Sequence, residues 1–376
     1  MTCEQKYNTA FSDVRKIKKQ YLTEVLEKEN RCQLESIDLD DWSEKDREDA
    51  YQEEVLPYWK KFGLAPKRFW FELAGSRDHR MDPRFIPVDL LYTDIYPYMN
   101  YGMLRQGLMS KAHLEYIFSD VKQPPTVALK IEGVYLDEHR NLISKDDAIR
   151  LCRERNNTLF AKASTGTCSG KGITVFTPSS YSDEELQRIL EEAGSSFIIQ
   201  ERIRQHPLMD QINPSSVATI RVVSLLMEDK VHILSGALRL SAPDSPFVTV
   251  LDGGILAEIL DQGKLYPKVY ADIGKWYENG KGIFDDSFQV PSIERVYDEV
   301  KRIHPRIANF KCVGWDIAID ETGDPVLLEY NVFPGPICPQ TLRCKPLFNE
   351  HTDWILEDYF IHRQWEKNHR QDILIQ

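Results

Sequence analysis

Three residues near the end of the chain have the types and spacing of a metal site. Glu329 and Asn331 lie two apart in the segment VLLEYNVF, so a strand would point both side chains to one face. Asp316 lies inside the apolar segment CVGWDIAID, and the turn ETGD would pair the two segments as a hairpin. Two carboxylates and an amide oxygen are hard ligands of the kind that Mg²⁺ prefers. The alternative is a hairpin whose polar face is solvated, although small and apolar residues would share that face.

A glycine-rich segment, STGTCSGKG, occupies residues 164–172 between two predicted strands. Glycines let consecutive N–H groups face an anion, and hydroxyls and a lysine add donors, so this composition favours phosphate binding. It is not a Walker A motif, because the Gly-to-Gly-Lys spacing is one residue too short and a strand follows instead of a helix. A flexible hairpin loop is the alternative. Lys162, on the preceding strand, could reach an α- or β-phosphate as a point charge. Cys168 is not expected to act covalently.

Two arginines lie inside apolar strands, Arg221 in VATIRVVSLL and Arg239 in SGALRLS. A charged residue of this kind can protect the edge of a sheet from aggregation. On neighbouring strands of a sheet that also carries an acidic site, the pair instead predicts an anion clamp. Guanidinium groups suit phosphoryl groups and carboxylates alike.

Composition excludes several classes of protein. The chain has 376 residues, 42% of them hydrophobic and 28% charged, with a formal net charge of −12, so no nucleic-acid partner is expected. Its seven cysteines form no CxxC pair, which argues against a zinc site or a disulfide framework and favours a reducing compartment. The first residues, MTCEQKYNTAF, lack the apolar core of a signal peptide, and no long apolar run predicts membrane insertion. We expect a cytoplasmic protein.

The elements that must position these residues follow from the pattern of the chain. Residues 1–60 predict two or more helices, and the aromatic-rich residues 60–105 predict a packed connector, with core packing favoured over a cradle for a sugar. Helices are then predicted from 110 to before the prolines at 124–125, and over 145–155, 182–193 and 291–304. Strands are predicted in TVALKIEGVYL, TLFAKA, ITVF, SFIIQERI, VATIRVVSLLM, KVHILSGALRL, FVTVLDGGIL, CVGWDIAID and PVLLEYNVF. Without a long β-α-β-α alternation, these elements favour an α+β plan with mixed or antiparallel sheets.

Together, these motifs resemble the ATP-grasp superfamily, and most closely its sugar-transfer-associated branch, over roughly residues 95–345. The resemblance makes Lys111 and Lys162 the two nucleotide lysines. It makes residues 164–172 the phosphate loop, with Ser164, Ser169, Gly170 and Lys171 as donors. Two residues depart from the pattern of this family. Ala163 stands where a proline is common, and Asp252 stands before Gly253-Gly254 where an asparagine is common. The second departure bears on the acceptor site.

The rest of the site follows from the same resemblance. The hinge strand would read adenine with the main chain from Glu201 through Arg202 to Ile203, with Gln200 beside the base and His206 near the ribose. Arg221 and Arg239 would be the catalytic arginines, and Asp316, Glu329 and Asn331 the metal ligands.

The resemblance also implies a domain plan and a reaction. The plan is a helical and aromatic-rich region (1–94), an N-terminal ATP-grasp lobe (95–205), a C-terminal lobe with the Mg site (206–350) and a C-terminal helix (351–376), with two α+β lobes clasping ATP. The cofactors would be ATP and Mg²⁺, with Mn²⁺ as an alternative metal. The reaction would join a small carboxylate and a small amine, such as a sugar acid or an amino acid, through an acyl phosphate in surface polysaccharide or sugar-conjugate biosynthesis.

Two other functions remain open at this point. An ATP-grasp kinase that phosphorylates a hydroxyl would share every ATP residue and differ only in its acceptor. A non-catalytic nucleotide-binding protein would have no need to keep all three metal ligands. The sequence does not indicate an oligomeric state.

Overall fold

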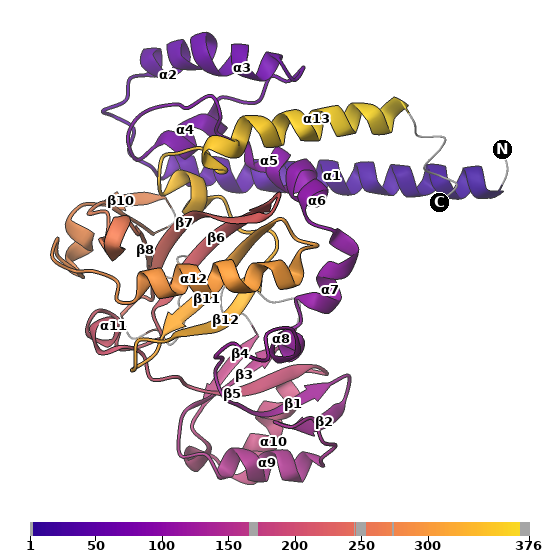
Figure 1. Cartoon of the computed structure of the whole chain (residues 1–376), viewed down its shortest axis with the longest axis vertical. Helices are drawn as coiled ribbons and strands as arrows, with labels where there is room; N and C mark the ends of the chain where they lie inside the picture. The colour runs from indigo at the N-terminus through magenta and orange to yellow at the C-terminus, as the bar shows by residue number, and fades with distance from the viewer. Residues whose placement is uncertain (1–2, 165–171, 244, 246–252, 273, 369–376) are drawn as a thin grey trace. The chain divides into compact units, whose positions relative to one another are not determined.

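The protein divides into two compact units in a computed structural model that describes residues 3–164, 172–243, 245, 253–272 and 274–368 (Figure 1). The first unit comprises Met1–Asn100, Ile273–Trp276 and Gly335–Gln376, and the second comprises Tyr101–Asp272 and Tyr277–Pro334. In the described residues, no helix is both long and apolar enough to cross a bilayer.

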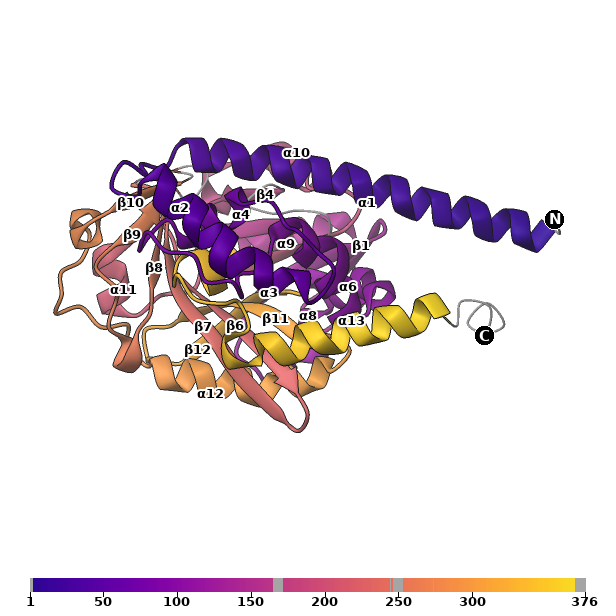
Figure 2. The same cartoon turned by 90° about the horizontal axis from the view of Figure 1, so that it is seen from above.

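The first unit is helical. Its longest helix, α1, runs unbroken through 33 residues (Figure 2). The aromatic-rich segment packs into the core of this unit: Trp59 and Phe71 are fully buried, with ring centroids 6.4 Å apart in an edge contact. Its main helical segments are α1 (Cys3–Glu35), α2 (Glu44–Ala50), η1 (Tyr51–Val55), α3 (Leu56–Lys60), α4 (Phe69–Gly75), α5 (Val88–Leu90), η2 (Leu91–Ile95), α6 (Tyr96–Met99), η10 (Ile337–Thr341), η11 (Asn349–His351) and α13 (Thr352–Asn368).

The second unit contains a five-stranded sheet in the order β2-β1-β5-β3-β4. Its strands are β1 (Thr126–Ile131), β2 (Val134–Asp137), β3 (Leu159–Ala163), β4 (Ile173–Phe176) and β5 (Phe197–Glu201), and its helices are α9 (Lys145–Arg153) and α10 (Asp183–Glu192). Ser144 and Ser182 start the two helices with capping boxes, which satisfy the first free N–H groups. Apolar residues of both helices, including Ile149 and Leu186, form one core with one face of the sheet.

A seven-stranded sheet follows in the order β10-β9-β8-β7-β6-β11-β12. Its strands are β6 (Thr219–Met227), β7 (Lys230–Leu240), β8 (Ile255–Glu258), β9 (Val269–Ala271), β10 (Lys275–Tyr277), β11 (Cys312–Ile319) and β12 (Pro325–Asn331). Helix α12 (Ile293–Ile303) lies across one face (Figure 1) and buries Val296 and Val300 in a core with alternate residues of the strands, such as Val222. The residues between these, including Arg221, therefore point to the opposite face.

The α+β plan is confirmed, and the registered strand pairs of both sheets are antiparallel. The helix predicted from Ser110 is shorter than expected, with a 3₁₀ turn at Lys111–His113 and α8 at Leu114–Ile117. Phe118, the residue after α8, leaves the helical conformation and packs edge-on against Trp315 and Tyr330. This tertiary contact overrides the local helical pattern.

The core of the second unit contains a buried histidine with a complete set of hydrogen bonds. His304 Nε2 lies 2.9 Å from the carbonyl of Phe310, and Nδ1 lies 2.8 Å from Ser224 Oγ, which accepts from the indole of Trp315. The carbonyl partner indicates that Nε2 carries the proton of a neutral ring. Burial lowers the pKa of His304 to about 4, although the Phe310 carbonyl opposes the shift.

We expect this histidine to make the fold acid-sensitive. Its folded pKa lies below the ordinary value, so the unfolded chain takes up the proton first as the pH falls. Stability should therefore be lost between about pH 6.5 and 4, at up to about 1.4 kcal/mol per pH unit. Urea unfolding at pH 7.5 and 5.0 should show a smaller pH effect in His304→Gln than in the wild type. His139→Gln, which replaces an exposed histidine, is the control, and equal pH effects in all three proteins would contradict the assignment.

Candidate functional site

Three of the residues predicted from the sequence, Glu329, Asp316 and Arg221, lie in one row across the seven-stranded sheet. The register pairs Glu329 of β12 with Asp316 of β11, and Asp316 with Arg221 of β6. Across β7 the row continues through Ala237 to Glu258 of β8. Directly opposite residues of antiparallel strands share a face, so these side chains all lie on the face opposite α12.

Asp316 lies in this row between Glu329 and Arg221. Its carboxylate accepts from Arg221 Nε at 2.6 Å and Nη2 at 2.8 Å, and Arg239 Nη1 lies 3.2 Å from both oxygens. Burial by itself raises the pKa of Asp316, but the charges of Arg221 and Arg239 outweigh burial and hold the pKa far below its ordinary value. Asp316 is therefore ionised, and the sheet keeps a fixed negative charge between two guanidinium groups.

Glu329 is the more accessible carboxylate of the pair. It lies beside Asp316 and makes an ion pair with Lys111, at 3.3 Å between Oε2 and Nζ. Asn331, two residues along β12, pairs in register with Gly314 and so lies on the same face as Glu329. Within the described chain no group of three or more acidic, histidine or cysteine side chains could hold a metal. The two carboxylates and the amide fit a magnesium ion that takes its remaining ligands from water and phosphate oxygens.

The face of the five-stranded sheet away from α9 and α10 carries Lys162. Its ammonium donates to Gln200 Oε1 at 3.0 Å, across β3 and β5. Burial lowers the pKa of Lys162 to about 8, although Glu329 opposes the shift and Lys111 adds to it. Half-buried Ile173 and Val175 of β4 share this face, and sequence reasoning did not single them out. An apolar surface beside a lysine suits a purine base and its phosphates.

The start of the predicted phosphate loop shows one buried group with an unmet hydrogen bond. The Ser164 hydroxyl is buried and has no partner within the described residues, whereas the Ser164 carbonyl accepts from the N–H of Lys111 at 3.0 Å. A buried hydroxyl without a partner costs free energy, and a phosphate oxygen would supply that partner. Ser169, Gly170 and Lys171, predicted from the same loop, lie outside the described residues, as do Cys168 and Asp252.

In the predicted hinge after β5, some main-chain groups already have hydrogen-bond partners within the protein and are not available to an adenine base. The N–H of Glu201 donates to the Pro125 carbonyl and that of Arg202 to the Thr158 carbonyl. The Glu201 side chain pairs with Arg155 at 3.1 Å, so it is committed to the protein. The prediction for the hinge therefore narrows to the Glu201 carbonyl and the N–H of Ile203, for which the described chain shows no acceptor.

His206 begins helix α11 (Pro207–Ile212), and its Nδ1 accepts from the N–H of Leu208 at 3.2 Å. Only Nε2 is left for a ribose hydroxyl, so the predicted role can involve that nitrogen alone. The Arg202 side chain donates to the Pro214 carbonyl at 3.1 Å, so it is committed to the protein as well.

Sequence reasoning missed two polar residues on the same sheet face. Glu258 is buried in the apolar segment ILAEIL, and a charged residue inside such a strand was the available signal. Ser235 pairs in register with Val223, two residues beyond Arg221, and its buried hydroxyl has no partner among the described residues. Small, fully buried Ala237 lies between Ser235 and Arg239 on this face.

The lowered pKa of Lys162 predicts that ATP binding takes up protons near pH 8. The lysine is half protonated there, and the phosphates would favour its charged form, so about half a proton should bind with ATP. As the pH rises above 8, affinity should fall. Calorimetry in buffers of different ionisation enthalpy would measure the uptake. Lys162→Arg should abolish it, because arginine stays protonated. The control Lys145→Arg, which replaces a partly exposed lysine paired with Glu191, should not. If proton uptake persisted in Lys162→Arg, the proton would bind to a group other than Lys162.

A family model described as sugar-transfer associated ATP-grasp matches residues 127–353. Among solved structures, the L-amino acid ligase from Bacillus licheniformis has 11% identity and a TM-score of 0.34, over 60% of this chain and 41% of that one. The D-alanyl-alanine synthetase A from Vibrio cholerae has 10% identity and a TM-score of 0.41, over 68% and 65%. The chain thus spans less than two thirds of both. No curated protein matches it.

Proposed function

Because the chain belongs to the sugar-transfer associated ATP-grasp family, we propose that it is an ATP-dependent carboxylate–amine ligase. It would form an amide through an acyl phosphate, from a small carboxylate and a small amine such as a sugar acid and an amino acid. Surface polysaccharide or sugar-conjugate biosynthesis is the proposed setting.

The observation that carries this proposal is the ionised Asp316, held between Arg221 and Arg239 and next to Glu329. Transfer of the γ-phosphoryl group needs charge stabilisation and positioning, and no covalent enzyme intermediate. Asp316, Glu329 and Asn331 would hold Mg²⁺, with Mn²⁺ as an alternative, and the ion would neutralise charge on the β- and γ-phosphates. Arg239, whose contact with Asp316 is longer than that of Arg221, is the arginine that we expect to turn toward the transferred group.

The proposed reaction has two steps, phosphoryl transfer and amide formation, and different residues would serve each step. Lys111 and Lys162 would bind phosphate oxygens while a carboxylate oxygen of the substrate attacks the γ-phosphorus and ADP leaves. The nitrogen of the amine then attacks the acyl carbon, phosphate leaves, and the amine proton passes to a base. We assign that proton to the carboxylate of Glu258. This buried residue lies on the same face of the sheet, and only the small Ala237 stands between it and Arg221 in the row. A dry site would protect the acyl phosphate from hydrolysis.

Incubation of the protein with Mg²⁺–ATP and matched panels of carboxylic acids and amines tests this proposal. ADP release that depends on both an acid and an amine, with an amide detected by mass spectrometry, supports ligation. A stable phosphorylated product would instead identify a kinase. Binding of ATP with no turnover across the panels would support a non-catalytic nucleotide-binding protein.

A further inference from the structure

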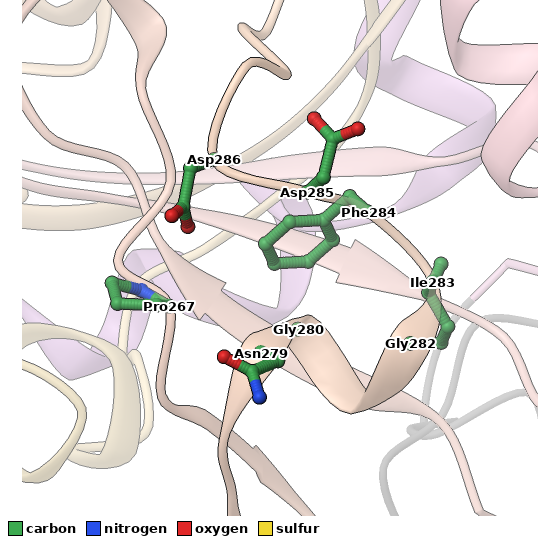
Figure 3. A pocket seen from close by; sticks show the side chains of 8 residues that line it. All are labelled: Pro267, Asn279, Gly280, Gly282, Ile283, Phe284, Asp285 and Asp286. Atoms are coloured by element: carbon green, nitrogen blue, oxygen red, sulfur yellow. The ribbon is translucent and has the colours of Figure 1, made fainter.

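A pocket lies beside β9, away from the row of charged residues. It is an open pocket of about 520 Å³, and its walls include Pro267, Asn279 and Phe284 (Figure 3). Strands β8, β7 and β6 separate β9 from β11, which carries Asp316. Four strand spacings correspond to about 19 Å, so this pocket is distinct from the candidate ATP site.

An unusual turn shapes one wall of the pocket. The four residues from Asn279 to Gly282 all have positive φ, at 52°, 58°, 55° and 74°. A Cβ added at Gly280 would lie 2.8 Å from the Phe284 ring, so the ring packs directly on the bare glycine. Phe288 supports the Phe284 ring, with centroids 6.2 Å apart. The half-buried aromatic ring is thus a fixed wall of the pocket.

Two polar side chains at the pocket are available to a ligand. Asp285 is already committed, because its carboxylate accepts from the N–H and the hydroxyl of Ser287 at 2.9 and 2.5 Å. In contrast, the described residues provide no hydrogen bond or ion pair to the side chains of Asp286 and Asn279. Figure 3 shows the Asp286 carboxylate turned toward Pro267, with the Asn279 amide below the Phe284 ring in this view. The pocket therefore presents an acceptor, a mixed donor and acceptor, and an aromatic ring.

The side chains that line the pocket favour some classes of ligand over others. Neither lysine nor arginine lines the pocket, and two aspartates do, so phosphates and carboxylates are disfavoured. A simple ammonium ion would use the carboxylate and leave the amide N–H groups of Asn279 unmatched. We propose that the pocket binds a neutral pyranose sugar. The ring of Phe284 would contact the C–H face of the sugar, Asp286 would accept from its hydroxyls, and Asn279 would both donate and accept.

Sugar binding can be tested on the full chain without ATP, so its outcome is independent of the proposed ligase activity. The probes are methyl glucoside and N-acetylglucosamine, with methylammonium and glucose 6-phosphate for comparison, in saturation-transfer NMR titrations. We expect millimolar binding of the neutral sugars, with the strongest transfer to ring C–H protons on one face. An excess of Mg²⁺–ATP should leave the signal unchanged.

Three variants locate the binding. Asn279→Gly removes the amide but keeps a residue that tolerates positive φ, and Asp286→Asn removes the charge at an exposed position. Asp286→Asn should weaken sugar binding about tenfold and Asn279→Gly several-fold, following the usual strengths of charged and neutral hydrogen bonds. Glu278→Gln is the control, because Glu278 is exposed, pairs with Lys268 and does not line the pocket. It should bind as the wild type does.

Several results would overturn this proposal. Absence of sugar binding at millimolar concentrations would do so, as would binding of methylammonium alone. Equal binding by all three variants would place the sugar elsewhere, and displacement of the sugar by ATP would place it in the nucleotide site.

Discussion

The Glu329→Gln variant is expected to release ADP at least about a hundredfold more slowly than the wild type while keeping its fold. The substitution removes the accessible charge of the proposed metal site and changes the shape of the side chain little. Glu329 is partly exposed and pairs only loosely with Lys111 at 3.3 Å, so its loss should cost little stability. Mg²⁺ should no longer tighten ATP binding in this variant, a calorimetric measurement that needs no acceptor substrate.

Glu321→Gln is the matched control for this experiment. Glu321 lies in the turn of the same β11–β12 hairpin, and its side chain is largely exposed, 3.9 Å from Arg204. This variant should keep the wild-type turnover and Mg²⁺ dependence. Near wild-type activity in Glu329→Gln would show that the metal assignment is wrong. An equal loss in both variants would point to a change in the hairpin as a whole.

The second large effect is expected on stability. Asp316→Ala removes the buried carboxylate and leaves the Arg221 and Arg239 guanidinium groups without their shared counter-charge. Removal of one partner from a buried ion pair typically costs about 3–5 kcal/mol, because the remaining charge stays desolvated. The arginine side chains are 13% and 18% exposed, which places the expected loss toward the lower end of that range. Urea unfolding followed by circular dichroism measures the change.

Two further variants define the cause of that loss. Asp316→Asn keeps an acceptor for one arginine and should be less destabilised than Asp316→Ala. Asp298→Ala removes an exposed carboxylate on α12, 3.1 Å from Lys301, and should unfold at the wild-type midpoint. If Asp316→Ala also unfolded at that midpoint, the arginines would not depend on Asp316 for their charge balance.

The local patterns of the sequence determined much of the fold. The patterns of the chain located most strands, and the helices predicted over 145–155 and 182–193 correspond to α9 and α10, which Ser144 and Ser182 start with capping boxes. Such patterns depend only on residues that are close together in the chain, so they can be recognised in a single sequence. The helix after Ser110 was overestimated because its end depends on Phe118 packing against Trp315 and Tyr330, which are distant in sequence.

The same distinction applies to the candidate site. The sequence by itself determined the residue types, the two-residue spacing of Glu329 and Asn331, and the order of motifs that identified the family. Only the tertiary structure decided that Asp316 pairs with both arginines, because strand register sets which side chains become neighbours. It also decided that burial lowers the pKa of Lys162 and that Glu258 shares the face of Arg221. Burial and cross-strand pairing depend on residues that are far apart in the chain. The spacing of residues along one strand therefore cannot predict them.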